Sequence, residues 1–129
     1  MKKFKILIPV FNDWQSLSKI LNNIDNEIKY ITHEISLIIV DDASTFDRQL
    51  DIENLSNIIS IKILSMKENR GHARCIATGL KYIFEKEEFD YVIPMDGDGE
   101  DRPEEIIEFI KSSEKAPDQT IVGERIKRS

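Results

Sequence analysis

Two aspartates that could bind a cation, Asp96 and Asp98, follow the apolar run 91–95, with Gly97 between them and Pro103 shortly after. Ending a strand in bare carboxylates is a poor way to build a core. It is a good way to hold Mg²⁺ or Mn²⁺ against an anionic ligand, because both ions prefer oxygen ligands. Taken alone, these residues fit a turn and helix cap equally well.

A second acidic pair, Asp41 and Asp42, follows the apolar run 35–40. In doubly wound folds an acid at a strand end often hydrogen-bonds a ribose or a base, although a solvated loop acid is as common. After the next apolar run comes Asn69-Arg70-Gly71. Arg70 could contact a base or phosphate oxygens, and a glycine before a helix leaves backbone N–H groups free to face an anion.

A framework of alternating strands and helices must position these polar residues. Short apolar runs predict strands at 4–10, 35–40, 59–64, 91–95 and 120–123, the third of them nearer a sheet edge. Helical spacing predicts a helix capped by Asn12 or Asp13, a second over 72–85 and a third from Pro103. The polar segment 45–58 predicts a short helix. The positions expected to face inward are Leu17, Ile20, Leu21 and Ile24 in the first helix, Cys75 or Ile76, Leu80, Ile83 and Phe84 in the second, and Ile106, Phe109 and Ile110 in the third.

Alternation of strand and helix predicts an α/β fold with a mainly parallel open sheet and helices on both faces. In such sheets ligands bind beyond the carboxyl ends of the strands. The unusual residues of this chain all follow strand ends: 9–13, 41–42, 68–71, 96–101 and 123–125. We therefore expect a single ligand-binding site at the edge of the sheet where the carboxyl ends of the strands lie.

Composition narrows the class of protein. At 129 residues with 40% hydrophobic and 33% charged residues, the chain fits one globular domain, and its net charge of −6 argues against nucleic acid as the partner. One cysteine excludes an intrachain disulfide, and the sequence shows neither a signal peptide nor an 18-residue apolar run. We expect a cytoplasmic location, with membrane association as an option for a longer protein.

Four stretches together carry a family resemblance that covers nearly the whole chain. They are Ile8-Pro9-Val10-Phe11-Asn12-Asp13, Ile39-Val40-Asp41-Asp42-Ala43-Ser44, Asn69-Arg70-Gly71 with Thr78-Gly79-Leu80, and 96–104. In this order and spacing they resemble the nucleotide-sugar-binding half of inverting family 2 glycosyltransferases with the Rossmann-like GT-A fold. The last stretch is similar to that of polyprenyl- and dolichyl-phosphate sugar transferases, although Glu100 stands where those relatives often have glutamine.

The resemblance implies a role for each matched position. The donor, a UDP- or GDP-sugar, would lie against Pro9, Val10, Phe11, Asn12, Asp42, Arg70, Asp96 and Gly97. Asp42 would read the edge of the base, with Arg70 close by. Asp98 would hold Mg²⁺ or Mn²⁺ on the diphosphate, with Asp96 near the same metal or the ribose, and the cation would neutralise the charge of the leaving group. The acceptor would be a lipid phosphate or a glycan.

The resemblance also implies that catalysis needs more than residues 1–129. In this family the general base and most acceptor contacts come from a later region, so we expect a single donor-binding domain, truncated before the acceptor half, with the base beyond Ser129. A non-catalytic nucleotide-sugar-binding module and a sugar nucleotidyltransferase are the alternatives, the latter lacking its usual Gly-rich loop here. A phosphotransfer receiver domain fits poorly, because the acidic residues follow the wrong strands.

Overall fold

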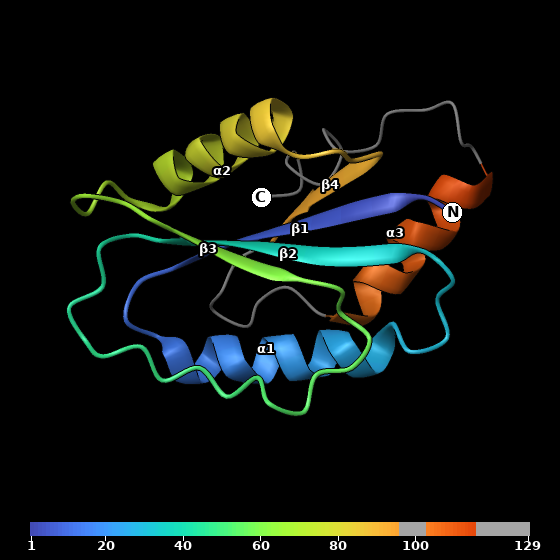
Figure 1. Cartoon of the computed structure of the whole chain (residues 1–129), viewed down its shortest axis with the longest axis horizontal. Coiled ribbons are helices and arrows are strands. Elements are labelled where there is room, and N and C mark those ends of the chain that lie inside the picture. Colours follow the sequence, from blue (N-terminus) through green and yellow to red (C-terminus); the bar gives the residue numbers. More distant parts are fainter. Residues whose placement is uncertain (96–102, 116–129) are drawn as a thin grey trace.

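In the part of the chain that the structure describes, four strands form one sheet. The computed structural model describes residues 1–95 and 103–115 (Figure 1). In chain order the elements are β1 (Lys3–Val10), α1 (Trp14–Glu27), β2 (Glu34–Asp41), β3 (Ile61–Ser65), α2 (His72–Lys86), β4 (Tyr91–Pro94) and α3 (Pro103–Lys115). The predicted strand at 120–123 lies outside the described residues.

All strand pairs are parallel, in the order β3-β2-β1-β4. β1 is central, with Ile8 opposite Ile39 of β2 and Leu7 opposite Pro94 of β4. From β1 the chain winds outward to β2 and β3, and it later returns to the other side of β1 as β4. The strand order therefore reverses between β1 and β4, and a crevice outside their carboxyl ends is where ligands of open α/β sheets bind.

Helices cover both faces of the sheet, as the alternation predicted. α1 and α3 lie on one face and α2 on the other (Figure 1). Each face of the sheet has its own hydrophobic core, and alternate side chains of β1 pack into one or the other. Phe4, Ile6 and Ile8 pack in the core with α1 and α3. Leu7 packs in the other core, with Cys75 and Ile83 of α2.

Gly79 sets how closely α2 approaches the sheet. A Cβ atom at this position would lie 2.3 Å from Leu7 Cδ1 and 3.1 Å from Val40 Cγ2. Only a residue without a side chain lets the helix lie this deep, so the glycine fixes the seat of α2 on β1 and β2.

The largest departure from the sequence-based expectation is the segment 42–60, where the predicted short helix at 45–58 is wrong. The chain runs back beside α1 without regular structure (Figure 1). Side chains of α1 hold it: the Ser18 hydroxyl accepts from the backbone of Asp51, and the Asp25 carboxylate accepts from the backbone of residues 56–58. These side chains of α1 take the place of helical hydrogen-bond partners at residues 51 and 56–58.

The expected helix faces are otherwise confirmed, with one exception. The predicted core positions of α1 and α3 are buried, as are Cys75 and Ile83 of α2, while Leu80 and Ile76 are half-buried and pack against the same core. The inward position expected for Phe84 is wrong, because the residue is 62% exposed. Its ring packs against that of Phe89, with the ring centroids 5.0 Å apart. The third strand does lie at a sheet edge, as β3.

Candidate functional site

Three connections meet at the carboxyl edge of the sheet, on the left in Figure 1. They leave β1, β2 and β3 respectively. Pro9 and Val10 still belong to the sheet, where they pair with Val40 and Asp41 of β2, and both are buried. What these two residues can present to a ligand is therefore backbone. Phe11, the next residue, is 48% exposed and lies free of the core.

Asn12 joins the connection after β1 to the one after β2. Its backbone adopts a positive φ of 62°, and its N–H group donates to the Ser44 hydroxyl at 2.8 Å. Its side-chain oxygen accepts from the backbone N–H groups of Thr45 at 2.8 Å and Phe46 at 2.9 Å. The side-chain oxygen of Asn12 therefore holds the connection after β2 in place at the carboxyl edge of the sheet.

Asp13 is the N-cap of α1, one of the two caps expected. Its carboxylate accepts from the backbone of Ser16 at 3.3 Å. Trp14, the first residue of the helix, is buried, and the Arg48 guanidinium lies 5.3 Å from the centre of its ring. An open hollow of about 1080 Å³ lies beside this helix start and is lined by Asn12 and Phe46 among others.

The two acids after β2 have separate partners. Asp41 closes a local turn, accepting from the backbone N–H of Ser44 at 2.9 Å, and it also lies 3.6 Å from the Arg48 guanidinium. The turn passes through Ala43, whose φ is 60°. The sequence did not reveal this role, although an aspartate just after a strand commonly accepts from a backbone N–H group a few residues further on.

Asp42 holds the connection after β3. Its Oδ1 accepts from the backbone N–H of Arg70 at 2.7 Å and its Oδ2 from that of Gly71 at 2.8 Å. The amide of Asn69 adds a bond to the Asp42 carbonyl at 3.2 Å. Asp42 is only 5% exposed, so these bonds are shielded from water.

The turn at Arg70 and Gly71 leads directly into α2. Gly71 has a φ of 93° and a ψ of 164°, a backbone conformation that side-chain-bearing residues rarely adopt. The expectation that the backbone N–H groups of this turn would be free to face a ligand anion is wrong for these two residues. The anion at the start of the helix is the chain's own Asp42 carboxylate, which the helix dipole also favours.

The Arg70 side chain remains available to a ligand. It is 54% exposed, and its guanidinium contacts the Glu68 carboxylate. An exposed ion pair of this kind contributes little to stability, so the guanidinium can exchange Glu68 for an incoming acceptor at small cost.

Cys75 lies one turn into α2 and faces Asp42. Burial, and after it a hydrogen bond to the Asp42 carboxylate, together raise the pKa of its thiol to about 12. The thiol is therefore a protonated donor at neutral pH and not a nucleophile. This agrees with its expected role as a small core residue.

The predicted metal ligands Asp96 and Asp98, with Gly97, lie outside the described residues. The described chain reaches the site edge as expected, because Met95 donates its N–H to the Leu7 carbonyl at 2.8 Å beside β1. Within residues 1–95 and 103–115, no three His, Cys, Asp or Glu side chains gather in a way that could hold a metal ion. The metal expectation therefore rests on two carboxylates, a donor type that suits Mg²⁺ and Mn²⁺.

The family model for glycosyl transferase family 2 matches residues 5–129. The chain belongs to this family. The resemblance carried by the four sequence stretches is thereby confirmed, and the family membership favours the transferase interpretation over a sugar nucleotidyltransferase.

Curated relatives of this family 2 chain include transferases with a lipid phosphate in their names. It is 30% identical over 127 residues to the undecaprenyl-phosphate 4-deoxy-4-formamido-L-arabinose transferase of Proteus mirabilis, covering 97% of this chain and 37% of that protein. It is 25% identical over 125 residues to the dolichol-phosphate mannosyltransferase of Pyrococcus furiosus, covering 97% of this chain and 34% of the relative. The chain thus spans about a third of the length of these relatives.

Solved structures confirm the expected GT-A type fold. The TarS fragment 1–349 of S. aureus in complex with UDP-GlcNAc matches with a TM-score of 0.63 at 22% identity, covering 88% of this chain and 31% of that one. The mannosyltransferase PcManGT of Pyrobaculum calidifontis, in complex with GDP-Man and Mn²⁺, matches with a TM-score of 0.53 at 22% identity over 75% of this chain and 28% of that one.

None of the described helices of this family 2 chain is long and apolar enough to cross a membrane.

Proposed function

We propose that this chain is the donor-binding domain of a glycosyltransferase. It binds a UDP- or GDP-sugar with a divalent cation, and the complete enzyme transfers the sugar to a lipid phosphate or a glycan. The observation that carries the proposal is the family 2 match over residues 5–129. It is supported by relatives named as lipid-phosphate sugar transferases and by the convergence of Asn12, Asp42 and Arg70 at one sheet edge.

The nucleoside would lie over the ends of β1 and β2. Each Asp42 oxygen already accepts one backbone N–H and the carboxylate also accepts from the Cys75 thiol, but a carboxylate offers about four lone-pair sites. It therefore retains acceptor capacity for one N–H of a uracil or guanine base. Arg70 would contribute a guanidinium that can stack on the base or meet a phosphate oxygen. Phe11 and the backbone of Pro9 and Val10 would form the surface on which the nucleoside lies.

Asp96 and Asp98, which follow β4 in the sequence, would hold the cation. When bound, Mg²⁺ or Mn²⁺ would supply positive charge against the diphosphate. The chain's own residues bind and orient the donor, and Gly97 allows the backbone to approach it closely. The acceptor hydroxyl needs a general base, which we assign to a region after Ser129 in the complete protein.

Titration calorimetry with UDP and GDP, each with and without Mn²⁺, tests the proposal. We expect metal-dependent binding of one nucleotide by the wild type and its loss in Asp98→Ala. The matched control is Asp47→Ala, because Asp47 is an exposed acid on the segment after β2 and has no assigned role. Equal loss in both variants would mean a nonspecific charge effect. Absence of binding for both nucleotides with Mn²⁺ and with Mg²⁺ would contradict the proposal.

Lipid-phosphate and glycan acceptors are distinguished by assaying the full-length protein. Transfer of radiolabelled sugar to an organic-soluble polyprenyl phosphate would identify the first class, and transfer to a water-soluble oligosaccharide the second. Hydrolysis or binding without transfer would favour the non-catalytic module.

A further inference from the structure

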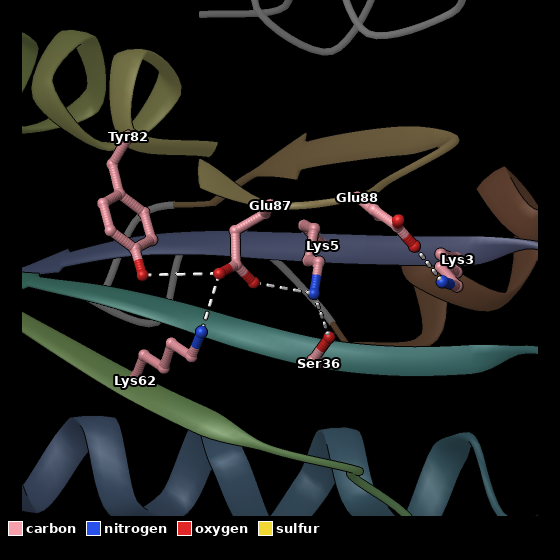
Figure 2. A network of polar contacts seen from close by, with 7 residues as sticks. All are labelled: Lys3, Lys5, Ser36, Lys62, Tyr82, Glu87 and Glu88. Carbon is pink, nitrogen blue, oxygen red and sulfur yellow. Dashed lines mark hydrogen bonds and ion pairs between the residues drawn. The ribbon is translucent and has the colours of Figure 1, made fainter. Parts of the chain in front are cut away.

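Another carboxylate shielded from solvent, that of Glu87, lies at the other end of α2, far from the candidate site. Figure 2 shows it at the centre of a polar network. Its oxygens accept from Lys5 Nζ at 3.0 Å, from Lys62 Nζ at 2.7 Å and from the Tyr82 hydroxyl at 3.3 Å. Lys5 also donates to the Ser36 hydroxyl at 2.9 Å.

This network joins the end of α2 to three strands at once. Lys5 belongs to β1, Ser36 to β2 and Lys62 to β3 (Figure 2). Because β2 lies between β1 and β3, the Glu87 carboxylate bridges across it. The side chains of Glu87 and Lys5 are only 9% and 11% exposed, so their ion pair is largely shielded from solvent. The Lys62 bond is the first cause, and the Lys5 bond a further one, of a lowered pKa of Glu87.

α2 is therefore tied to the sheet by a carboxylate at each end. At its start, Asp42 of the sheet edge binds the backbone of Arg70 and Gly71. At its end, Glu87 of the helix cap binds the strands. Between them Gly79 seats the helix against Leu7. The helix has 15 residues and spans about 22 Å, which is the distance over which the two ties are linked.

A helix held at both ends transmits a displacement of one end to the other, because its own hydrogen bonds resist compression and bending. Loss of the Glu87 charge would weaken its bonds to Lys5 and Lys62, which tie this end of the helix to β1 and β3, and the helix end could then shift along the sheet. The opposite end of the same helix carries the Arg70–Gly71 turn. Its bonds to Asp42 depend on where α2 lies along the sheet.

We propose that Glu87 is a positioning residue for the Arg70–Gly71 turn, acting through α2 from the opposite edge of the sheet. By fixing the helix along its axis, Glu87 keeps the two backbone N–H groups in line with the Asp42 carboxylate and Arg70 over the site. Its expected effect on nucleotide affinity rests on the proposed function. Its effect on the turn does not.

The experiment compares Glu87→Gln with Glu88→Gln by amide NMR and hydrogen exchange on the chain without ligand. Glu88 is the matched control, since it is the adjacent glutamate and its ion pair with Lys3, at 2.8 Å, is exposed. We expect the Arg70 and Gly71 amide resonances to shift in Glu87→Gln and to exchange roughly tenfold faster or more than in wild type, as loss of a charge-assisted bond implies. In Glu88→Gln both amides should match the wild type.

Two further variants separate positioning from general loss of stability. Ile110→Val trims the fully buried core under α3, on the face away from α2, and should lower the unfolding midpoint without moving the Gly71 resonance. Lys62→Met removes one partner of Glu87 from a half-exposed position and should shift the same amides less than Glu87→Gln does. If Glu87→Gln does not fold, Lys62→Met still tests the proposal.

Unchanged Arg70 and Gly71 amides in both Glu87→Gln and Lys62→Met would overturn the proposal, as would equal shifts in Ile110→Val. In calorimetry, Glu87→Gln should bind the nucleotide several-fold more weakly than Glu88→Gln does, with the metal requirement unchanged. If the wild type binds no nucleotide, the proposed function fails while the amide result still decides the role of Glu87.

Discussion

Oδ2 of Asp42 lies 2.8 Å from the backbone nitrogen of Gly71, and this bond places a buried carboxylate at the start of α2. The residue expected to read a base is thus also the residue that builds the turn beside it. A ligand at Asp42 and the position of Arg70 are coupled through one side chain.

Asp42→Asn should destabilise the fold even without ligand. An asparagine can accept with one oxygen only, so its NH₂ group would oppose the backbone N–H of Arg70 or Gly71. Loss of one bond to a buried charged group predicts a fall of about 1.5–3 kcal/mol in the free energy of unfolding. Urea unfolding followed by circular dichroism measures it. Asp47→Asn, at an exposed position, should change the value by less than about 0.5 kcal/mol. Equal values for the two variants would contradict this role.

Gly79→Ala should destabilise the chain by overpacking. The added Cβ would overlap Leu7 Cδ1, and inserting a methyl group into a filled core typically costs about 1–3 kcal/mol. In a Leu7→Ala background the same change should cost much less, because the overlapping atoms are gone. A double-mutant cycle on thermal or urea unfolding measures the coupling, and strictly additive effects would rule out the proposed contact.

Asp25 should make stability pH-dependent. Burial raises the pKa of its carboxyl, but backbone bonds from Ser56, Ile58 and Asn57 outweigh burial and leave the pKa below its ordinary value. A lowered folded-state pKa contributes stability that is present above the unfolded-state value, about 3.9, and is lost as pH falls through the folded-state pKa.

The wild type should therefore exceed Asp25→Asn in stability by about 1–3 kcal/mol at pH 7, and the gap should narrow as pH falls below about 4. Urea unfolding of both proteins across this range measures the gap. A gap that is constant with pH would show that the lost contribution does not come from ionisation.

Cys75 should resist thiol reagents in the folded protein. Its buried thiol, with a pKa of about 12, carries almost no thiolate at pH 8. Reaction with a disulfide reagent, followed by absorbance, should be very slow in buffer and fast in urea. Rapid labelling of a protein whose circular dichroism stays native would show that the thiol is accessible.

Local sequence pattern was enough to predict the four strands and three helices of the described residues, because each has the hydrophobic run or the 3.6-residue hydrophobic period typical of its type. The spacing of Leu17, Ile20, Leu21 and Ile24 already specified the buried face of α1. Pro103 likewise marked the first residue of α3.

Two features could not be predicted this way, because their partners are distant in sequence. The 42–60 segment is shaped by Ser18 and Asp25, about thirty residues away, and nothing local in the segment reveals these bonds. The bond between Asp42 and Gly71 spans a separation of 29 residues. Phe84 was misassigned because helical spacing alone does not say where the sheet beneath a helix ends.

The irregular 42–60 segment has a consequence for dynamics. Its backbone is held largely by side chains of Asn12, Ser18 and Asp25 rather than by a ladder of its own. Such segments open at lower free energy than helices and strands, so hydrogen exchange and proteolysis should attack it first. Each opening would release Asn12 from Thr45 and Phe46 and loosen the site edge while the sheet stays intact. The lifetime of the assembled site is then set by the rate of this local opening, which occurs more often than global unfolding.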